Sequence, residues 1–402
     1  MSAEKLVFEQ LRACPAAHVY QAFTNSTMLR KWMCDVATVS PKPGGRFYAA
    51  WINGFYTSGE YTRLEADRLV GFQWFGRGDP APTQVEVTFN AKENSTLLHL
   101  EHRGLGVGEE WDTPRVEIEK GWNKFLENLA AVVGSGEDLR ITRRPMLGVL
   151  WGEFTPETAQ KMGVPVTKGV RLGGVVEGLG AYNAGLHKDD VLVSLDGQAM
   201  EGWDDLAPVL QRHRAGDKIE VTFYRGAERK QIELELARRP MPEIPSTIEG
   251  LAAAIKRTYE GYSSEIDKVL GGVTDEEAAY RPSPDEWGMR EILMHLIQSE
   301  RYEHANIVDI VNGHEPWQED FTEDDRFHIT GMLAAYPKLK DLVNELKRVY
   351  AETIGLFGAL PKDLPENKAR YWFLAYNSLQ PPYHFQEHIG QIHSLIAAAR
   401  GG

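Results

Sequence analysis

The sequence DEWGMREILMHLIQSERYE, residues 285–303, decides the fold of the C-terminal part of the chain. Its apolar residues recur every three to four positions, which predicts an amphipathic helix. A second stretch, YHFQEHIGQIH (residues 383–393), is also predicted to be helical. Four long helices of this kind make an all-α four-helix bundle. We expect them over residues 247–270, 289–311, 332–357 and 382–399.

Three histidines lie on these predicted helices in positions that favour a metal site. His384 and His388 are four residues apart, so both project from one face of the last helix. His295 lies on the second helix. Two imidazoles at this spacing can share one metal ion. Two solvated histidines would show the same spacing, so the pair by itself leaves both interpretations open.

Polar residues continue the faces that carry these histidines. Ser299 and Tyr302 follow on the second helix and Gln391 on the last one, where a bundle core would be apolar. Buried polar groups cost free energy unless they pair, so this stripe predicts a pocket lined by Ser299, Tyr302 and Gln391. His304 and His393 each lie nine residues after a candidate ligand, and at about 100° per residue we expect them on the outer faces.

The two stretches together resemble the DinB/YfiT-like family of metal-binding four-helix bundles. The family's Trp, its first His and its HxxxH motif match Trp287, His295, His384 and His388, while Gly288 stands where the family prefers Ser or Thr. The resemblance implies that the three histidines bind a divalent metal such as zinc, nickel or iron. It also implies a metal-dependent transferase or hydrolase that activates a thiol or water. The alternative is a non-catalytic, ligand-binding scaffold protein in which the metal is structural or absent.

A peptide-binding loop is predicted from the middle of the chain. The stretch PMLGVLWG (residues 145–152) precedes short strands, an Ala-Gly-Leu turn and a helix that begins near Trp203. At Gly148 the backbone can turn so that consecutive amides converge on one anion. Leu206 and Leu210 would form the wall of an adjacent groove. The residues predicted to bind peptide are Leu147, Gly148, Val149, Leu206 and Leu210.

This middle segment resembles a PDZ domain of the type attached to HtrA-like proteases, with AGL, DDVLVSLDG and YRG in the family's order. The resemblance implies that a protein's C-terminal peptide adds to a sheet edge. Lys188 and Asp189 replace the family's Pro-Gly turn, but Asp tolerates left-handed dihedral angles. The chain lacks a serine-nucleophile signature, which excludes a serine protease. A PDZ domain used only as a spacer or for intramolecular docking remains an alternative.

The first segment alternates strand-forming runs with turn residues, which predicts an antiparallel sheet followed by a long helix over residues 117–133. A curved sheet on a helix encloses a cavity suited to an apolar small molecule. Trp51, Trp74 and Trp122 are the residues expected at this apolar cavity. The same tryptophans would equally fill a packed core, so both interpretations remain open.

Residues 15–33, 43–74 and 119–133 of this segment resemble START-like homologues of the heat-shock protein 90 ATPase activator. This resemblance implies a helix-grip fold around a cavity. The predicted fold class is therefore multidomain α+β, with a helix-grip START-like domain, a β-barrel-like PDZ domain and an all-α four-helix bundle. We place these domains at residues 1–137, 141–240 and 246–402, separated by joints at 134–145 and 237–246.

The composition restricts the partners and the compartment. A formal charge of −14 and a pI near 5.4 exclude nucleic acid and anionic membrane as main partners. The absence of a secretory signal pattern and the presence of only Cys14 and Cys34, each interpreted as a small buried hydrophobe, favour the cytoplasm. The acidic segment 315–325 is expected to be a solvated loop. The oligomeric state is not encoded in any of these features.

Overall fold

Alternating apolar and polar residues form a seven-stranded antiparallel sheet in the first domain. The protein is described by a computed structural model, which covers residues 4–283, 286–314 and 326–401. The sheet order is β1-β7-β6-β5-β4-β3-β2. Five of the strands follow the strand-forming runs at residues 45–52, 55–66, 68–75, 83–91 and 96–104, whereas β1 and β2 were not predicted. The strands are β1 (Glu4–Arg12), β2 (Val36–Val39), β3 (Arg46–Ala50), β4 (Tyr56–Glu65), β5 (Leu69–Gly76), β6 (Thr83–Lys92) and β7 (Ser95–Leu105).

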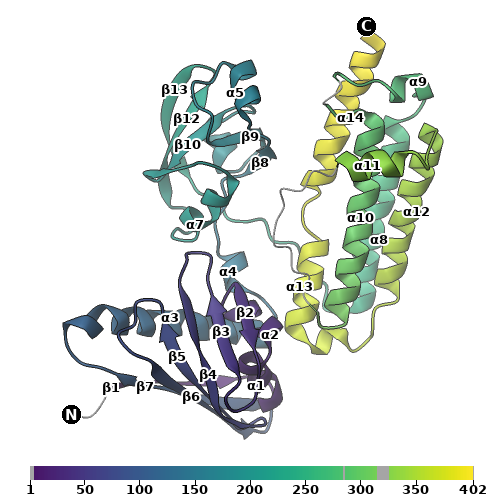
Figure 1. Cartoon of the computed structure of the whole chain (residues 1–402). Helices are drawn as coiled ribbons and strands as arrows, with labels where there is room; N and C mark the ends of the chain where they lie inside the picture. Colours follow the sequence, from purple (N-terminus) through teal and green to yellow (C-terminus); the bar gives the residue numbers. More distant parts are fainter. Residues whose placement is uncertain (1–3, 284–285, 315–325, 402) are drawn as a thin grey trace. The chain divides into compact units, whose positions relative to one another are not determined.

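Three helices accompany this sheet: α1 (Ala16–Thr24), α2 (Ser26–Trp32) and α3 (Glu109–Gly134). The long helix α3 lies along one face of the sheet (Figure 1), and Trp122 of α3 contacts Trp74 of β5 with ring centroids 5.5 Å apart. The helix predicted over residues 117–133 begins earlier than expected, at Glu109. Its acidic first turn, with Glu109, Glu110 and Asp112, suits a helix N-terminus.

The segment 134–145 is not the simple joint that its small and charged residues predicted. It contains the short helix α4 (Leu139–Thr142), and Asp138 caps this helix by accepting from the backbone amide of Arg140. The side chain of Arg140 donates to the backbone carbonyl of Cys34 at 2.8 Å, and the Asn128 amide donates to Asp138 at 3.0 Å. These hydrogen bonds hold the segment against the first domain.

The middle domain contains a second antiparallel sheet, ordered β13-β12-β10-β9-β8, with β11 paired to β10. Its strands are β8 (Val149–Gly152), β9 (Val170–Val175), β10 (Val191–Leu195), β11 (Gln198–Ala199), β12 (Lys218–Arg225) and β13 (Glu228–Glu235). Its helices are α5 (Pro156–Met162), α6 (Gly180–Asn183) and α7 (Leu206–Leu210), with a 3₁₀ turn η1 (Trp203–Asp205) before α7. Asp189 has φ 71°, so the predicted left-handed turn at this position is confirmed.

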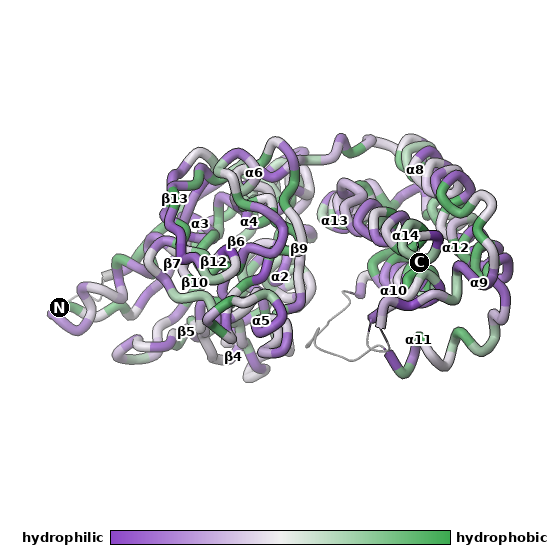
Figure 2. Tube along the Cα trace, turned by 90° about the horizontal axis from the view of Figure 1, so that it is seen from above, coloured by the Kyte–Doolittle hydropathy of each residue, from purple (hydrophilic) through white to green (hydrophobic). Residues whose placement is uncertain are grey.

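The C-terminal unit is all-α and contains the four predicted long helices. Its elements are α8 (Ile248–Val269), α9 (Asp275–Ala278), α10 (Met289–Val311), α11 (Arg326–Leu333), α12 (Leu339–Gly358), η2 (Leu364–Glu366), α13 (Lys368–Ser378) and α14 (Tyr383–Gly401). Hydrophobic and hydrophilic residues alternate along these helices, as amphipathic helices require (Figure 2). Their apolar faces form a core that includes Leu293, Leu346 and Ile392.

One helix start in this unit was predicted wrongly. The helix expected from residue 332 begins at Leu339, because Pro337 disfavours helical dihedral angles at the residue before it. The separate helices α9, α11 and α13 were not predicted.

The chain divides into two compact units, Met1–Pro240 and Met241–Gly402, and the first unit contains both antiparallel sheets. The predicted multidomain α+β class is confirmed. Cys14 and Cys34 are both buried, as expected. None of the helices in the described ranges combines the length and apolar character needed to cross a bilayer. The predicted acidic loop 315–325 lies outside the described residues.

Candidate metal centre

The three predicted histidine ligands come together from two helices. His295 projects from the second turn of α10, whose first turn is capped by Glu291 accepting from the Gly288 amide at 3.1 Å. His384 and His388 project from successive turns of α14. The Nε2 atom of His384 lies 3.0 Å from the Nε2 atoms of both His295 and His388. One ring nitrogen from each of the three histidines lies within 4.8 Å of the other two, so the trio could hold one metal ion.

This geometry cannot be satisfied by hydrogen bonds within the trio. The Nε2 atom of His384 carries either one proton or one in-plane lone pair, so it can form only one of its two contacts as a hydrogen bond. At least one pair of ring nitrogens therefore remains without a proton between them. Imidazole nitrogens bound to one zinc ion at about 2.0–2.1 Å lie roughly 3 Å apart, which matches the observed separations. The donor set thus fits a single divalent cation.

The ring of His388 is held in the tautomer that a metal ligand needs. Its Nδ1 donates to the Oε1 atom of Gln391 at 2.9 Å, which leaves the lone pair on Nε2. Gln391 lies three residues further along α14 and is itself exposed. On the other side of the trio, the Trp287 ring lies with its centroid 5.0 Å from that of His295.

The electrostatics keep the three rings neutral. Burial lowers the pKa of His295 to about 3, and the neighbouring rings of His388 and His384 lower it further. Burial also lowers the pKa of His388. For the more exposed His384, burial and the His388 ring lower the pKa in the same direction. Neutral imidazoles offer their lone pairs to a cation at physiological pH.

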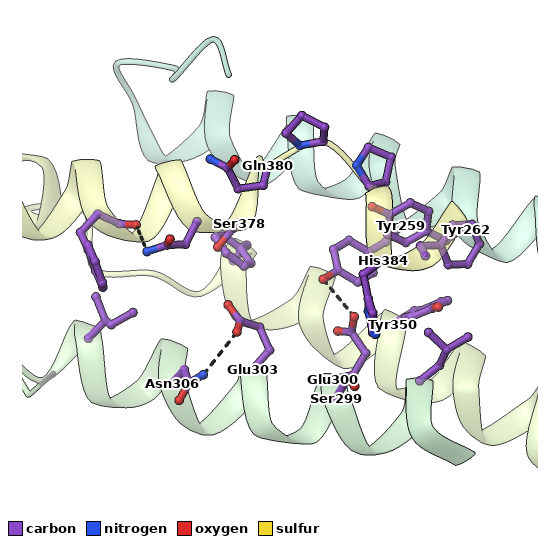
Figure 3. Close-up of a pocket in the computed structure, with 18 residues that line it drawn as sticks. Tyr259, Tyr262, Ser299, Glu300, Glu303, Asn306, Tyr350, Ser378, Gln380 and His384 are labelled. Carbon is purple, nitrogen blue, oxygen red and sulfur yellow. Dashed lines mark hydrogen bonds between the residues drawn. The ribbon is translucent and has the colours of Figure 1, made fainter. Parts of the chain in front are cut away.

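Of the residues predicted to line a pocket beside the histidines, the structure places only one on the cavity. A cavity of about 480 Å³ opens beside His384, and Ser299 lies on its wall (Figure 3). Tyr302 is 52% exposed. Gln391 contacts His388.

Sequence reasoning missed the acidic part of the cavity wall, Glu300 and Glu303 on α10. Burial raises the pKa of Glu300 to about 7. A sequence signal was present, because Glu303 lies four residues after Ser299 and therefore continues the polar stripe of α10.

The two histidines predicted on outer faces, His304 and His393, differ in their exposure. His393 is exposed, as predicted. His304 was predicted on an outer face, and this is wrong: its Nε2 lies 2.8 Å from Thr353 Oγ1 on α12, and only 17% of its side chain is exposed. The 100° rule gives an angle around one helix, but a bundle has neighbours on several sides.

The predicted peptide loop lies at a free sheet edge. Strand β8 is last in the sheet order and pairs only with β9 among the described strands. Gly148 has φ 81°, and an added Cβ would lie 2.4 Å from the Leu179 side chain. In the described part of the chain, no backbone carbonyl accepts from the amides of Leu147 or Gly148. Leu206 is buried, whereas Val149 and Leu210 are half-buried beside the core.

In the first domain the predicted cavity residues contact one another. The centroid of the Trp74 ring lies 6.3 Å from that of Trp51 and 5.5 Å from that of Trp122, and Trp51 stacks on Phe125 at 5.4 Å. Trp74 and Trp122 are buried, and Trp51 is half-buried. The three tryptophans and Phe125 therefore form one aromatic cluster.

Comparison with known proteins supports two of the three domains. Residues 13–134 match the family described as activator of Hsp90 ATPase homolog 1-like protein, and residues 145–236 match the PDZ domain family. Both matches lie outside the helical unit, so its DinB/YfiT-like character stays a proposal. The chain therefore contains an activator-homologue domain of the START-like fold and a PDZ domain.

Two curated relatives share a short region with this chain. A probable periplasmic serine protease do/HhoA-like from Haemophilus influenzae is 24% identical over 123 residues, covering 31% of this chain and 26% of the relative. A probable periplasmic serine endoprotease DegP-like from Marinomonas is 27% identical over 97 residues, which cover 24% of this chain and 21% of the relative. The chain thus spans about a quarter of these relatives. Both are named periplasmic, so the cytoplasmic compartment remains a prediction.

Solved structures similar to about a third of the chain include CalU16 from Micromonospora echinospora, at 25% identity and a TM-score of 0.28, covering 33% of this chain and 77% of that one. An Hsp90 activator from Plasmodium falciparum is 23% identical with a TM-score of 0.28, covering 32% and 96%. The Aha1 dimer from Colwellia psychrerythraea is 17% identical with a TM-score of 0.29, again covering 32% and 96%.

Proposed function

We propose that the helical unit binds one divalent metal ion through the Nε2 atoms of His295, His384 and His388. The observation that supports this most directly is the convergence of three neutral ring nitrogens, with contacts of 3.0 Å that hydrogen bonds alone cannot satisfy. The resemblance to DinB/YfiT-like bundles points to the same residues. Zinc, nickel and iron all accept three imidazoles, so the metal's identity stays open.

We further propose that this centre activates a thiol or a water molecule, as a metal-dependent transferase or hydrolase would. A divalent ion with three neutral ligands retains an open position and acidifies a thiol or water bound there. In this chain, Gln391 would fix the tautomer of His388, and His384 would present the centre to the cavity that it lines. The alternative is a scaffold in which the metal is structural.

Elemental analysis of the purified full-length chain tests the metal proposal. We expect about one equivalent of a divalent metal in the wild type and less than a tenth of that in His388→Ala. His393→Ala is the matched control, because His393 lies on the same helix and is exposed. Equal metal content in all three proteins would remove the proposal.

A second measurement separates a catalytic centre from a structural one. In cobalt-substituted protein, a small thiol such as 2-mercaptoethanol is expected to produce a thiolate-to-metal absorption band if a coordination position is open. A spectrum that a large excess of thiol leaves unchanged would favour the scaffold alternative.

We propose that the PDZ domain binds the free C-terminus of a protein. Within residues that the structure describes, the amides of Leu147 and Gly148 have no backbone acceptor, and they lie beside the outer strand β8 of the sheet. Leu206 and Leu210 would contact the last apolar side chain. A peptide library displayed with free C-termini tests this on the full chain, with amidated peptides as the control. Leu210→Lys should abolish binding, and equal binding of amidated peptides would contradict carboxylate capture.

For the activator-homologue domain we propose only that it binds an apolar small molecule, with Trp51, Trp74 and Trp122 as contacts. A ligand would have to displace these packed rings, so its binding should change tryptophan fluorescence. A lipid-like dye that binds the wild type and Trp51→Ala equally would argue for a packed core instead.

A further inference from the structure

The cavity beside His384 combines features that a metal site alone does not explain. Its wall includes Glu300 and Glu303 from α10, Tyr259 from α8 and Ser378 from α13 (Figure 3). Its volume of about 480 Å³ suits a small organic molecule. His384 lies at its border, so the cavity and the candidate metal centre share one side chain.

The hydrogen-bond donors to Glu300 and Glu303 in the described part of the chain are uncharged. Among the residues that the structure describes, no Lys or Arg forms an ion pair with Glu300 or Glu303. The donors to Glu300 are the hydroxyls of Tyr259 at 3.2 Å and Thr353 at 2.9 Å. The donor to Glu303 is the side-chain amide of Asn306 at 3.4 Å. A half-buried carboxylate normally acquires a positive partner, because desolvation of an unpaired charge is costly.

Another acidic residue of the same bundle shows the usual arrangement. Glu345 on α12 is buried and pairs with Arg301 at 2.6 Å and with Arg348 at 3.2 Å. The bundle therefore does supply arginines to buried carboxylates elsewhere. The missing positive charge at Glu300 and Glu303 is a property of the cavity and points to a ligand that brings it.

The rest of the wall also suits a cation that carries N–H donors. The rings of Tyr259, Tyr262 and Tyr350 contact one another, with centroids 5.3 to 5.9 Å apart, and ring faces attract cations. The Oγ atom of Ser378 is buried and has no hydrogen-bond partner in the described ranges. It can accept a hydrogen bond from a ligand.

Distance along α10 separates the carboxylate of Glu303 from the candidate metal centre. Glu303 follows His295 by eight residues, which corresponds to about 12 Å of helix rise. A metal ion held by the three histidines would therefore lie at one end of the cavity, and Glu303 lies toward the other.

We propose that this cavity binds the ammonium group of a primary aliphatic amine at Glu300 and Glu303, with the carbon chain directed toward His384. The inference deepens the metal-centre proposal by naming a substrate class. Only the direction of the chain rests on that proposal, because the carboxylates and tyrosines form the cavity without the metal.

Saturation-transfer NMR on the full-length protein provides the test, with n-pentylammonium as the probe and 1-pentanol as its neutral analogue. We expect n-pentylammonium to bind and 1-pentanol not to bind at the same concentration. Glu303→Gln should weaken n-pentylammonium at least tenfold. The control is Glu276→Gln, since Glu276 is exposed on another helix of the unit. Glu300→Gln is a second variant, should Glu303→Gln fail to fold.

Several outcomes would overturn the proposal. These are no binding of n-pentylammonium to metal-replete wild type, equal binding of 1-pentanol, or equal binding of tetramethylammonium, which has no N–H donor. Metal content is measured on the same samples. We expect His388→Ala to retain n-pentylammonium binding while losing the metal. Failure of the metal proposal and failure of the amine proposal thus give different results.

Discussion

Two groups of histidines in this chain share a low pKa but differ in their partners. Burial lowers the pKa of His102 in the first domain to about 3, and it does the same for His295 in the helical unit. In His102 both ring nitrogens are occupied: Nδ1 accepts from Trp122 Nε1 at 3.0 Å, and Nε2 lies 2.7 Å from Thr83 Oγ1. Thr83 in turn donates to the backbone carbonyl of Trp74 at 2.9 Å.

The difference shows which buried histidine marks a site. His102 has a donor and an acceptor that fit one neutral tautomer, so it needs nothing further. The trio of His295, His384 and His388 turns three like atoms toward one point, and protons alone cannot satisfy them. Unsatisfied convergence, rather than burial or a shifted pKa, therefore distinguishes a ligand site from a structural histidine.

Removing metal should separate the two groups most strongly. A metal present at a thousand times its dissociation constant stabilises the folded state by about 4 kcal/mol. We expect a chelator to lower the melting temperature of the helical unit and to leave the transition of residues 1–240 unchanged. Calorimetry of the full chain with and without chelator measures both. A chelator that lowers only the melting temperature of residues 1–240 would contradict a metal site in the helical unit.

His102→Ala should be the next largest effect. The substitution leaves a cavity in a packed core and removes the acceptor of the buried Trp122 N–H, which together cost about 3 kcal/mol. Denaturant unfolding of the first unit is the measurement. His99→Ala on the same strand is the control, because the His99 side chain is 31% exposed and contacts Glu9 and Glu101. A loss below 1 kcal/mol would mean that the His102 network contributes little.

Local sequence signals predicted much of this comparison. The bounds of α10, Met289–Val311, agree with the predicted helix because its apolar period is regular and Glu291 reaches back to cap its start. The burial of His102 could also have been predicted from the sequence. Leu98, Leu100 and His102 alternate on β7, so all three point toward the core.

Contacts between distant segments account for what the sequence did not predict. Glu300 meets Tyr259 and Thr353 only because α8, α10 and α12 pack together, since the partners are 41 and 53 positions apart in the sequence. The error for His304 has the same origin, since Thr353 covers a face that a single helical wheel leaves open. Helical period places a residue on a face, but packing decides what covers that face.

Gln391→Leu should sharpen the comparison by removing one partner from the trio. Loss of the hydrogen bond to His388 Nδ1 frees the ring to change tautomer and orientation. Such partners contribute about 10- to 100-fold to metal affinity. Competition with a zinc-sensitive dye measures the change. The control is Gln386→Leu, an exposed glutamine on the same helix. An unchanged affinity would show that packing alone orients His388.

The smallest expected effect is the pH dependence of His102. The folded pKa of about 3 lies below the unfolded value of 6.5, so above pH 6.5 both states are neutral and the stability is fully present. Below pH 6.5 the unfolded chain takes up a proton that the folded protein cannot accept until about pH 3. At pH 5.5 this lowers the unfolding free energy by about 1.4 kcal/mol.

His102→Gln lacks the proton site, so its deficit in unfolding free energy relative to wild type should shrink by that amount between pH 7.5 and 5.5. Denaturant unfolding of both proteins at the two pH values measures the shrinkage. A deficit that stays constant would mean that His102 titrates alike in both states, and its two hydrogen bonds would then not explain the difference from the histidine trio.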